Sequence, residues 1–254
     1  MIFYRFFAFV FLGIFLSIGC AKITPTIGIK ISKDQLVNAL RSLDKAEKNI
    51  MSFASKGLME ISHISGSQEL KFYAVGTSEP FRIRLEWLAM QGLPISTIIV
   101  KDHNWLIINY MEKVAYEGYG SCEKLSELMG ICPTKSELYS ILLGELVLWE
   151  YTIMDVDERK GEVSIKLDND RIITISFDKQ FALINGFKDI DKNVLVEFYN
   201  GKGNDSVFKN FVKINSGILN PTITLKFNEL IKNIGIENDF FEEQIPYNFK
   251  MINF

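Results

Sequence analysis

Apolar side chains recur at every second position through much of this chain, and this period limits the fold more than any other feature. Residues 81–87 alternate strictly, so that Phe81, Ile83, Leu85 and Trp87 share one face. Comparable runs cover residues 58–64, 70–75, 95–100, 105–110, 113–119, 163–167, 172–177, 182–187, 194–199 and 222–227. No stretch between the earlier runs resembles a crossover helix. We therefore expect an antiparallel sheet with one solvated face.

Two capping boxes predict helices within this pattern of strands. Ser32 with Gln35 begins an amphipathic helix, for which Gly57 is the expected C-terminal cap. Thr134 with Glu137 begins a second helix. The order of one long helix, many strands, a mid-chain helical pair and more strands predicts an α+β domain. Its sheet is expected to be strongly curved or an open barrel, with helices on one side.

The first twenty residues predict an export signal. An apolar run over residues 6–19 ends at Gly19 and Cys20, and it is shorter than the roughly 20 residues of a spanning helix. The small residue before Cys20 fits a lipobox, in which the cysteine sulfur is acylated and residues 1–19 are removed. Ser17 stands where a lipobox usually has Leu. An ordinary signal peptidase could cut the same bond and leave Cys20 unmodified.

This leader divides the chain into a signal peptide over residues 1–19, a lipidated cysteine with a tether over residues 20–31, and a single domain over residues 32–254. One acyl chain binds a membrane only marginally, so stable anchoring needs two or three chains. Ala21 is not the Asp that commonly retains lipoproteins in the inner membrane. This favours a lipid anchor in the outer membrane, with the domain facing the periplasm.

Composition narrows the class of function. A content of 48% hydrophobic and 13% aromatic residues supports a real core, and a net charge of −3 without a basic block argues against nucleic acid. His63 and His103 lie far apart in the sequence, so we expect no metal site. The chain has no nucleophile motif and no phosphate-binding glycine loop. We therefore expect a binding protein rather than an enzyme, with no cofactor.

Cys122 and Cys132 remain once Cys20 is set aside. In an exported protein such a pair suggests a disulfide, which would clip a local loop and add ~2–3 kcal/mol. The sequence leaves open whether the two side chains approach closely enough to pair.

The order of elements and several local strings resemble the LolA/LolB-like lipoprotein carriers and receptors. Residues 81–87 run into an apolar loop over residues 88–94 and then a further strand, as in the LolB pattern. The string Leu-Met-Gly-Ile-Cys-Pro at residues 128–133 leads to Leu138 and to Leu-Leu-Gly at residues 142–144, similar to the mid-chain helices of that family. The cysteine at the end of the leader makes LolB the nearer pattern.

This resemblance implies an open half β-barrel with helices as a lid over an apolar cavity. The cavity would take the acyl chains of another lipoprotein, received from a soluble periplasmic LolA-like carrier and released into the outer membrane. Met90, with Leu93 beside it, maps to the loop that touches the membrane. The residues that could line the cavity are Phe72, Ile83, Leu85 and Trp87.

Each of these site predictions has a simpler alternative. The loop residues could fold back onto the core, and the four cavity residues could be ordinary core. The leading hypothesis is an outer-membrane lipoprotein that binds acyl chains and assists the insertion of lipoproteins into that membrane. The alternatives are a lipid-anchored module for another amphiphile, such as a phospholipid or glycolipid, and a structural lipoprotein with a filled barrel.

Overall fold

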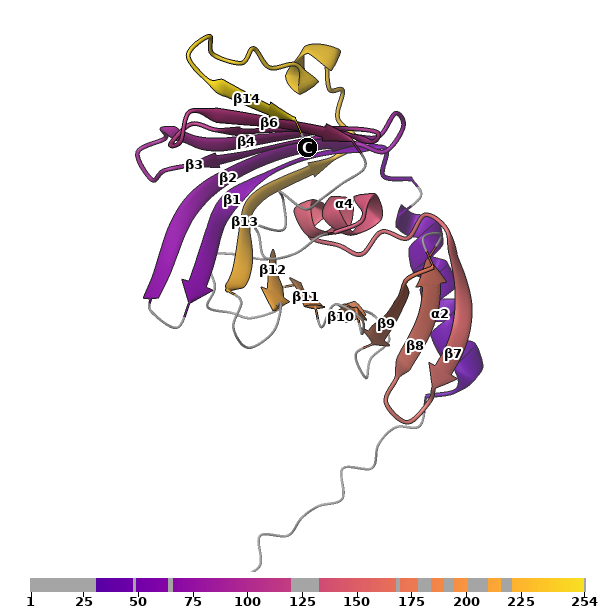
Figure 1. The fold of residues 1–254 in the computed structure, drawn as a ribbon. Helices are drawn as coiled ribbons and strands as arrows, with labels where there is room; N and C mark the ends of the chain where they lie inside the picture. Colours follow the sequence, from indigo (N-terminus) through magenta and orange to yellow (C-terminus); the bar gives the residue numbers. More distant parts are fainter. Residues whose placement is uncertain are drawn as a thin grey trace, which may run out of the picture. The chain divides into compact units, whose positions relative to one another are not determined.

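One curved sheet of 14 strands forms the body of the chain in this computed structural model (Figure 1). The structure describes residues 31–47, 49–63, 66–119, 133–167, 170–177, 184–189, 194–200, 210–215 and 221–253. The strand order is β14-β6-β5-β4-β3-β2-β1-β13-β12-β11-β10-β9-β8-β7. The two edge strands do not pair with each other, so the sheet stays open. The predicted α+β class and open, curved sheet are confirmed.

The strands and helices have the following bounds. The strands are β1 (Ser52–His63), β2 (Gly66–Thr77), β3 (Arg82–Leu88), β4 (Pro94–Lys101), β5 (Asn104–Asn109), β6 (Val114–Tyr119), β7 (Tyr151–Asp157), β8 (Glu162–Leu167), β9 (Ile172–Phe177), β10 (Ile184–Asp189), β11 (Val194–Asn200), β12 (Asn210–Asn215), β13 (Thr222–Lys232) and β14 (Lys250–Asn253). The helices are α2 (Lys33–Glu47), α4 (Lys135–Leu143) and the 3₁₀ turn η1 (Asn238–Phe241).

Burial alternates along several strands, so that one face of the sheet is apolar and buried. In β3 the odd-numbered residues are buried and the even-numbered residues are partly exposed, as the sequence predicts for a strand with period two. The same alternation recurs in β8 and β13. The buried residues of all these strands join one apolar cluster on the concave face.

Helix α2 begins as predicted but ends earlier than the sequence suggested. The Ser32 amide donates to Gln35 Oε1 at 3.0 Å, and the Gln35 amide donates to Ser32 Oγ at 3.3 Å, which completes the capping box. The expected cap at Gly57 is wrong, because residues 52–57 pair with both β2 and β13. Gly57 lies instead at a bulge in β1, where an added Cβ would meet the Lys226 carbonyl oxygen at 1.9 Å.

Helix α4 lies against the concave face. Its capping box is present as predicted, and Gly144 ends it with a left-handed φ of 77°. Ser55 Oγ of β1 donates to the Leu142 carbonyl at 2.8 Å, and the rings of Phe53 and Tyr139 meet edge to face at 4.9 Å. All side chains from Glu137 to Leu143 are buried. Leu36 and Leu40 of α2 join the same cluster, so both helices cover the dry face of the sheet.

A C-terminal segment over residues 233–249 crosses the other, convex face (Figure 1). We call it the strap. With Phe241, it buries a second, smaller apolar layer on the strands beneath, formed by Val75, Ile99 and Ile108.

The chain then adds β14 to the edge strand β6, and this is the one parallel pair among the described strands. The sequence did not predict this pair, since the return path depends on where the strap lies. Within the described residues, no helix has the length and apolar character needed to cross a membrane.

Candidate functional site

The four predicted cavity residues lie together on the concave face. Phe72 of β2 stands opposite Trp87 of β3, and Ile83 and Leu85 continue the same face along β3. All four side chains are no more than 5% exposed. They belong to the apolar cluster that the helices cover. That they line a lipid cavity stays a prediction, because in this structure they are packed as core.

The loop between β3 and β4 presents its apolar side chains to solvent. Met90 is 44% exposed and Leu93 is 67% exposed. Two backbone hydrogen bonds close the loop, from the Ala89 amide to the Leu93 carbonyl and from the Gly92 amide to the Ala89 carbonyl, both at 2.8 Å. Gly92 has a φ of +86°, a conformation that other residues rarely adopt. The loop is therefore a fixed turn that holds its two large side chains outward.

Two further segments place exposed apolar side chains at the same end of the sheet. The β5–β6 turn contains Met111, which is 74% exposed, and its Tyr110 amide donates to the Ile95 carbonyl at the start of β4. The end of the strap contains Tyr247, which is fully exposed, and the Lys250 amide donates to the Lys113 carbonyl in the β5–β6 turn. We call the set of Met90, Leu93, Met111 and Tyr247 the apolar tip. The sequence identified only its first two members.

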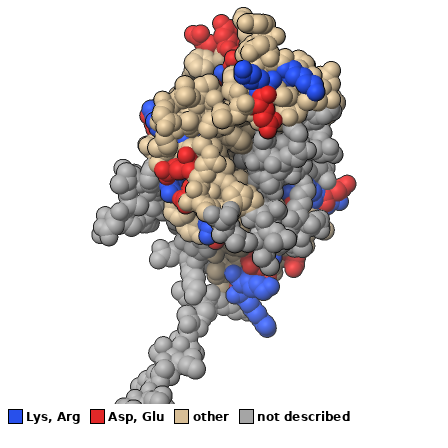
Figure 2. Space-filling model, turned by 60° about the vertical axis from the view of Figure 1, so that its left-hand side comes forward, with Lys and Arg blue, Asp and Glu red and all other residues tan. Residues whose placement is uncertain are grey.

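Charge is dispersed over the surface that can be seen. On the face drawn in Figure 2, basic and acidic side chains are interspersed and do not gather into one patch of either sign. No three metal-binding side chains cluster within the described part of the chain. His63 ends β1, and His103 lies in the turn between β4 and β5. The predicted lipid attachment site, Cys20, and the cysteines Cys122 and Cys132 lie outside the described residues.

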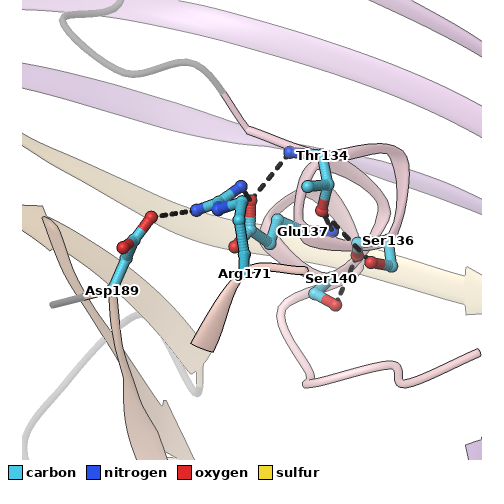
Figure 3. Close-up of polar contacts among 6 residues, drawn as sticks. All are labelled: Thr134, Ser136, Glu137, Ser140, Arg171 and Asp189. Atoms are coloured by element: carbon cyan, nitrogen blue, oxygen red, sulfur yellow. Dashed lines mark hydrogen bonds and ion pairs between the residues drawn. The ribbon is translucent and has the colours of Figure 1, made fainter. Parts of the chain in front are cut away.

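A buried ionic network ties α4 to the sheet (Figure 3). Arg171, just before β9, places Nη1 2.8 Å from Glu137 Oε2 of α4, and its Nη2 contacts Asp189 Oδ2 at the end of β10. The two carboxylate side chains are 6% and 1% exposed. Burial works to lower the pKa of Arg171, but the two carboxylates outweigh it and raise that pKa, so the guanidinium stays charged.

A polar groove of ≈ 460 Å³ lies beneath the strap. It is on the convex face, because Arg84 and Glu86 alternate with the buried residues of β3. The Arg84 guanidinium lies 2.5 Å from Glu243 of the strap and 2.6 Å from Glu86. Burial works to lower the pKa of Arg84, yet these hydrogen bonds raise it overall. A groove walled by ion pairs is a poor site for an acyl chain.

No protein-family model matches the chain, and no curated protein matches it in sequence. Solved structures match it in fold. A DUF1329 family protein from Desulfovibrio piger gives a TM-score of 0.56 at 9% identity, over 83% of this chain and 96% of its own. A LolA superfamily protein from Nitrosomonas europaea gives 0.51 at 8% identity, over 82% and 97%. A domain from Vibrio parahaemolyticus, named for outer-membrane lipoprotein sorting, gives 0.52 at 10% identity, over 81% and 95%.

These likenesses establish the fold of the chain. It has the LolA/LolB-like fold, an open curved sheet with helices on its concave face. The resemblance read from the strings at residues 81–98 and 128–144 is confirmed at that level.

Proposed function

We propose that this protein is a lipid-anchored lipoprotein of the outer membrane, facing the periplasm, that binds acyl chains on its concave face and assists the insertion of lipoproteins into that membrane. The observation that carries the proposal is the joining of a dry, helix-covered concave face to an apolar tip at one end of the sheet. The fold shared with a LolA superfamily protein and with a domain named for lipoprotein sorting supports it. The role requires no catalytic residue and no cofactor.

The concave face has the right chemistry for an acyl chain. Each CH₂ moved from water to an apolar site is worth ~0.8 kcal/mol, so a long chain cannot stay in water at low cost. Ile83, Leu85 and Ile98 form an apolar floor on adjacent strands. Because these side chains are buried in the cluster that α4 also joins, an acyl chain must displace part of that cluster as it binds.

The apolar tip suits the release step. Leu93 and Met111 are large, apolar and exposed on fixed turns. Such side chains gain free energy when they enter the interface of a bilayer. The exposed Lys113 and Lys250 lie close to Met111, but so does the exposed Glu112, so the attraction to a bilayer rests on the apolar side chains. The tip would therefore bring the concave face to the membrane that receives the cargo.

The test is a lipoprotein transfer assay. The soluble form beginning at Ala21 contains every residue that the structure describes. It would be mixed with a periplasmic carrier loaded with an acylated lipoprotein and with liposomes. Movement of cargo to the liposomes supports a role in lipoprotein insertion. The Met90→Glu variant should then lose this transfer while it still binds cargo.

Other outcomes favour other functions. If the cargo stays on the carrier while native mass spectrometry finds a phospholipid or glycolipid bound to the protein, the protein is a binding module for that amphiphile. If it takes neither cargo nor lipid, the acyl-binding proposal is wrong and a structural role with a filled barrel replaces it.

A further inference from the structure

Two buried polar atoms on the concave face have no hydrogen-bond partner within the described structure. They are Nε1 of Trp87 and Oγ of Ser96. Their side chains are 5% and 4% exposed. An indole N–H that is buried usually finds an acceptor, and an unmade hydrogen bond on a buried group is costly. Two such groups in one place call for a physical reason.

The two residues face each other across one strand pair. Trp87 of β3 stands directly opposite Ser96 of β4, so both side chains project from the same face of the sheet. That face is the concave one, because Ile98 and Val100 follow Ser96 at every second position and belong to the apolar cluster. The pair therefore offers two hydrogen-bond donors within an apolar surface.

Trp87 and Ser96 also form the cross-strand pair nearest the apolar tip among the pairs of β3 and β4 that face the concave side. Each such pair is called a row. The chain continues from Trp87 through Leu88 into the turn that carries Met90 and Leu93, and Ser96 follows that turn at the start of β4. Farther from the tip, the next rows are Leu85 opposite Ile98 and then Ile83 opposite Val100, which are all apolar. At about 3.3 Å per residue, the apolar rows extend about 13 Å inward from Trp87.

The geometry points to Trp87 Nε1 and Ser96 Oγ as the binding site for the ester carbonyl of an acyl chain. The inference rests on the acyl-binding function proposed above and names the group that the site recognises. The carbonyl oxygen has two lone pairs and can accept from both donors, while the chain that follows it runs inward over the apolar rows. The donors thereby fix the depth and direction of the chain, with its headgroup held toward the apolar tip.

A matched pair of ligands tests this inference in the soluble form that begins at Ala21. The probes are palmitoyl lysophosphatidylcholine, which has an ester carbonyl, and hexadecyl lysophosphatidylcholine, its ether analogue. Both would be titrated below their critical micelle concentrations and followed by calorimetry. The ester should bind at least about tenfold more tightly, because the ether leaves both donors without a good acceptor.

Substitutions test whether Trp87 and Ser96 cause the preference for the ester over the ether. Trp87→Phe removes the N–H together with one ring of the indole, and Ser96→Ala removes the hydroxyl independently. Each should reduce the ester-to-ether ratio, and the double variant should bring it close to one. Trp105→Phe is the matched control, since Trp105 is another buried tryptophan of the same core, on β5. This control should leave the ester-to-ether ratio unchanged. Because the ratio compares two ligands on the same variant, a general loss of affinity for lipids cancels.

The outcomes separate the two proposals. If the protein binds both probes equally, or if Trp87→Phe and Ser96→Ala keep the ester preference, the carbonyl site is wrong while acyl binding stands. If neither probe binds and no acylated cargo binds either, the proposed function fails and this inference fails with it.

Discussion

Arg171 Nη1 lies 2.8 Å from Glu137 Oε2, and this contact joins the start of α4 to the start of β9. Glu137 already serves α4 locally, because its other role is to accept from the Thr134 amide in the capping box. One carboxylate thus closes the helix end and connects it to the sheet. The contact holds α4 over the concave face, where acyl chains are proposed to bind.

Breaking this contact should destabilise the domain strongly. Arg171→Met leaves the Glu137 and Asp189 carboxylates buried without their cation, a change that costs about 3–5 kcal/mol in comparable buried pairs. Urea unfolding measures the loss. Lys166→Met is the control, because its pair with Asp170 is exposed and should cost less than about 1 kcal/mol. Equal effects of the two substitutions would show that the buried network adds no special stability.

The apolar tip should determine how well the soluble form binds vesicles. Leu93→Asp and Met111→Asp each remove an exposed apolar side chain that would enter the bilayer interface. Since burial of such a side chain is worth about 1.5–3 kcal/mol, each change should weaken binding roughly tenfold or more. Co-sedimentation with anionic liposomes measures it. Met154→Asp alters another exposed methionine, on β7, and should have little effect. A matching loss of vesicle binding in that variant would argue against the tip.

The strap should contribute stability through one of two adjacent phenylalanines. Phe241 is 1% exposed and packs on the convex face, whereas Phe240 is 48% exposed. Phe241→Ala should therefore cost about 3–5 kcal/mol, and Phe240→Ala should cost far less. Thermal or urea unfolding of both variants decides the matter. A similar loss in the two would mean that the strap does not pack on the sheet as described.

The bulge in β1 should not tolerate a side chain at Gly57. A Cβ there would lie 1.9 Å from the Lys226 carbonyl oxygen of β13, so Gly57→Ala must push two strands apart. We expect a loss of more than about 2 kcal/mol in the free energy of unfolding. At Gly235 an added Cβ meets nothing within 4 Å, so Gly235→Ala is the neutral comparison. Full stability in Gly57→Ala would contradict the close approach of β1 and β13.

Tyr139 should make stability depend on alkaline pH. Burial raises the pKa of its phenol above the usual value of 10.0. The unfolded chain therefore loses this proton first, so the contribution of Tyr139 is fully present below pH 10 and is lost as the pH rises above it. Urea unfolding of the native protein and of Tyr139→Phe between pH 8 and pH 11 isolates the effect. The difference between the two proteins should shrink toward the alkaline end, and a constant difference would refute the assignment.

The sequence by itself determined the parts of the fold that depend on local patterns. Alternation with period two specified the strands, as at residues 172–177, and side-chain capping specified where α2 and α4 begin. It also placed Ile83, Leu85 and Trp87 on one face, because a strand sends successive side chains to opposite sides. The pairing of β2 with β3 decided that Phe72 shares that face. The exposure of Met90 and Leu93 was foreseen only as one of two alternatives.

Only the tertiary structure decided which distant segments meet. Ala54 continues the helical spacing of Leu36, Leu40, Leu43 and Ile50, which favoured a helix as far as Gly57. Two ladders of hydrogen bonds nevertheless make residues 52–57 part of a strand, because tertiary pairing outweighs local propensity. Arg171 meets Glu137 from 34 residues away, and Arg84 meets Glu243 from 159 residues away. Neither partner leaves a local signal in the sequence. The pairing of Trp87 with Ser96 across β3 and β4 likewise followed from strand order and register, which a sequence pattern of period two leaves open. The same is true of the addition of Met111 and Tyr247 to the apolar tip.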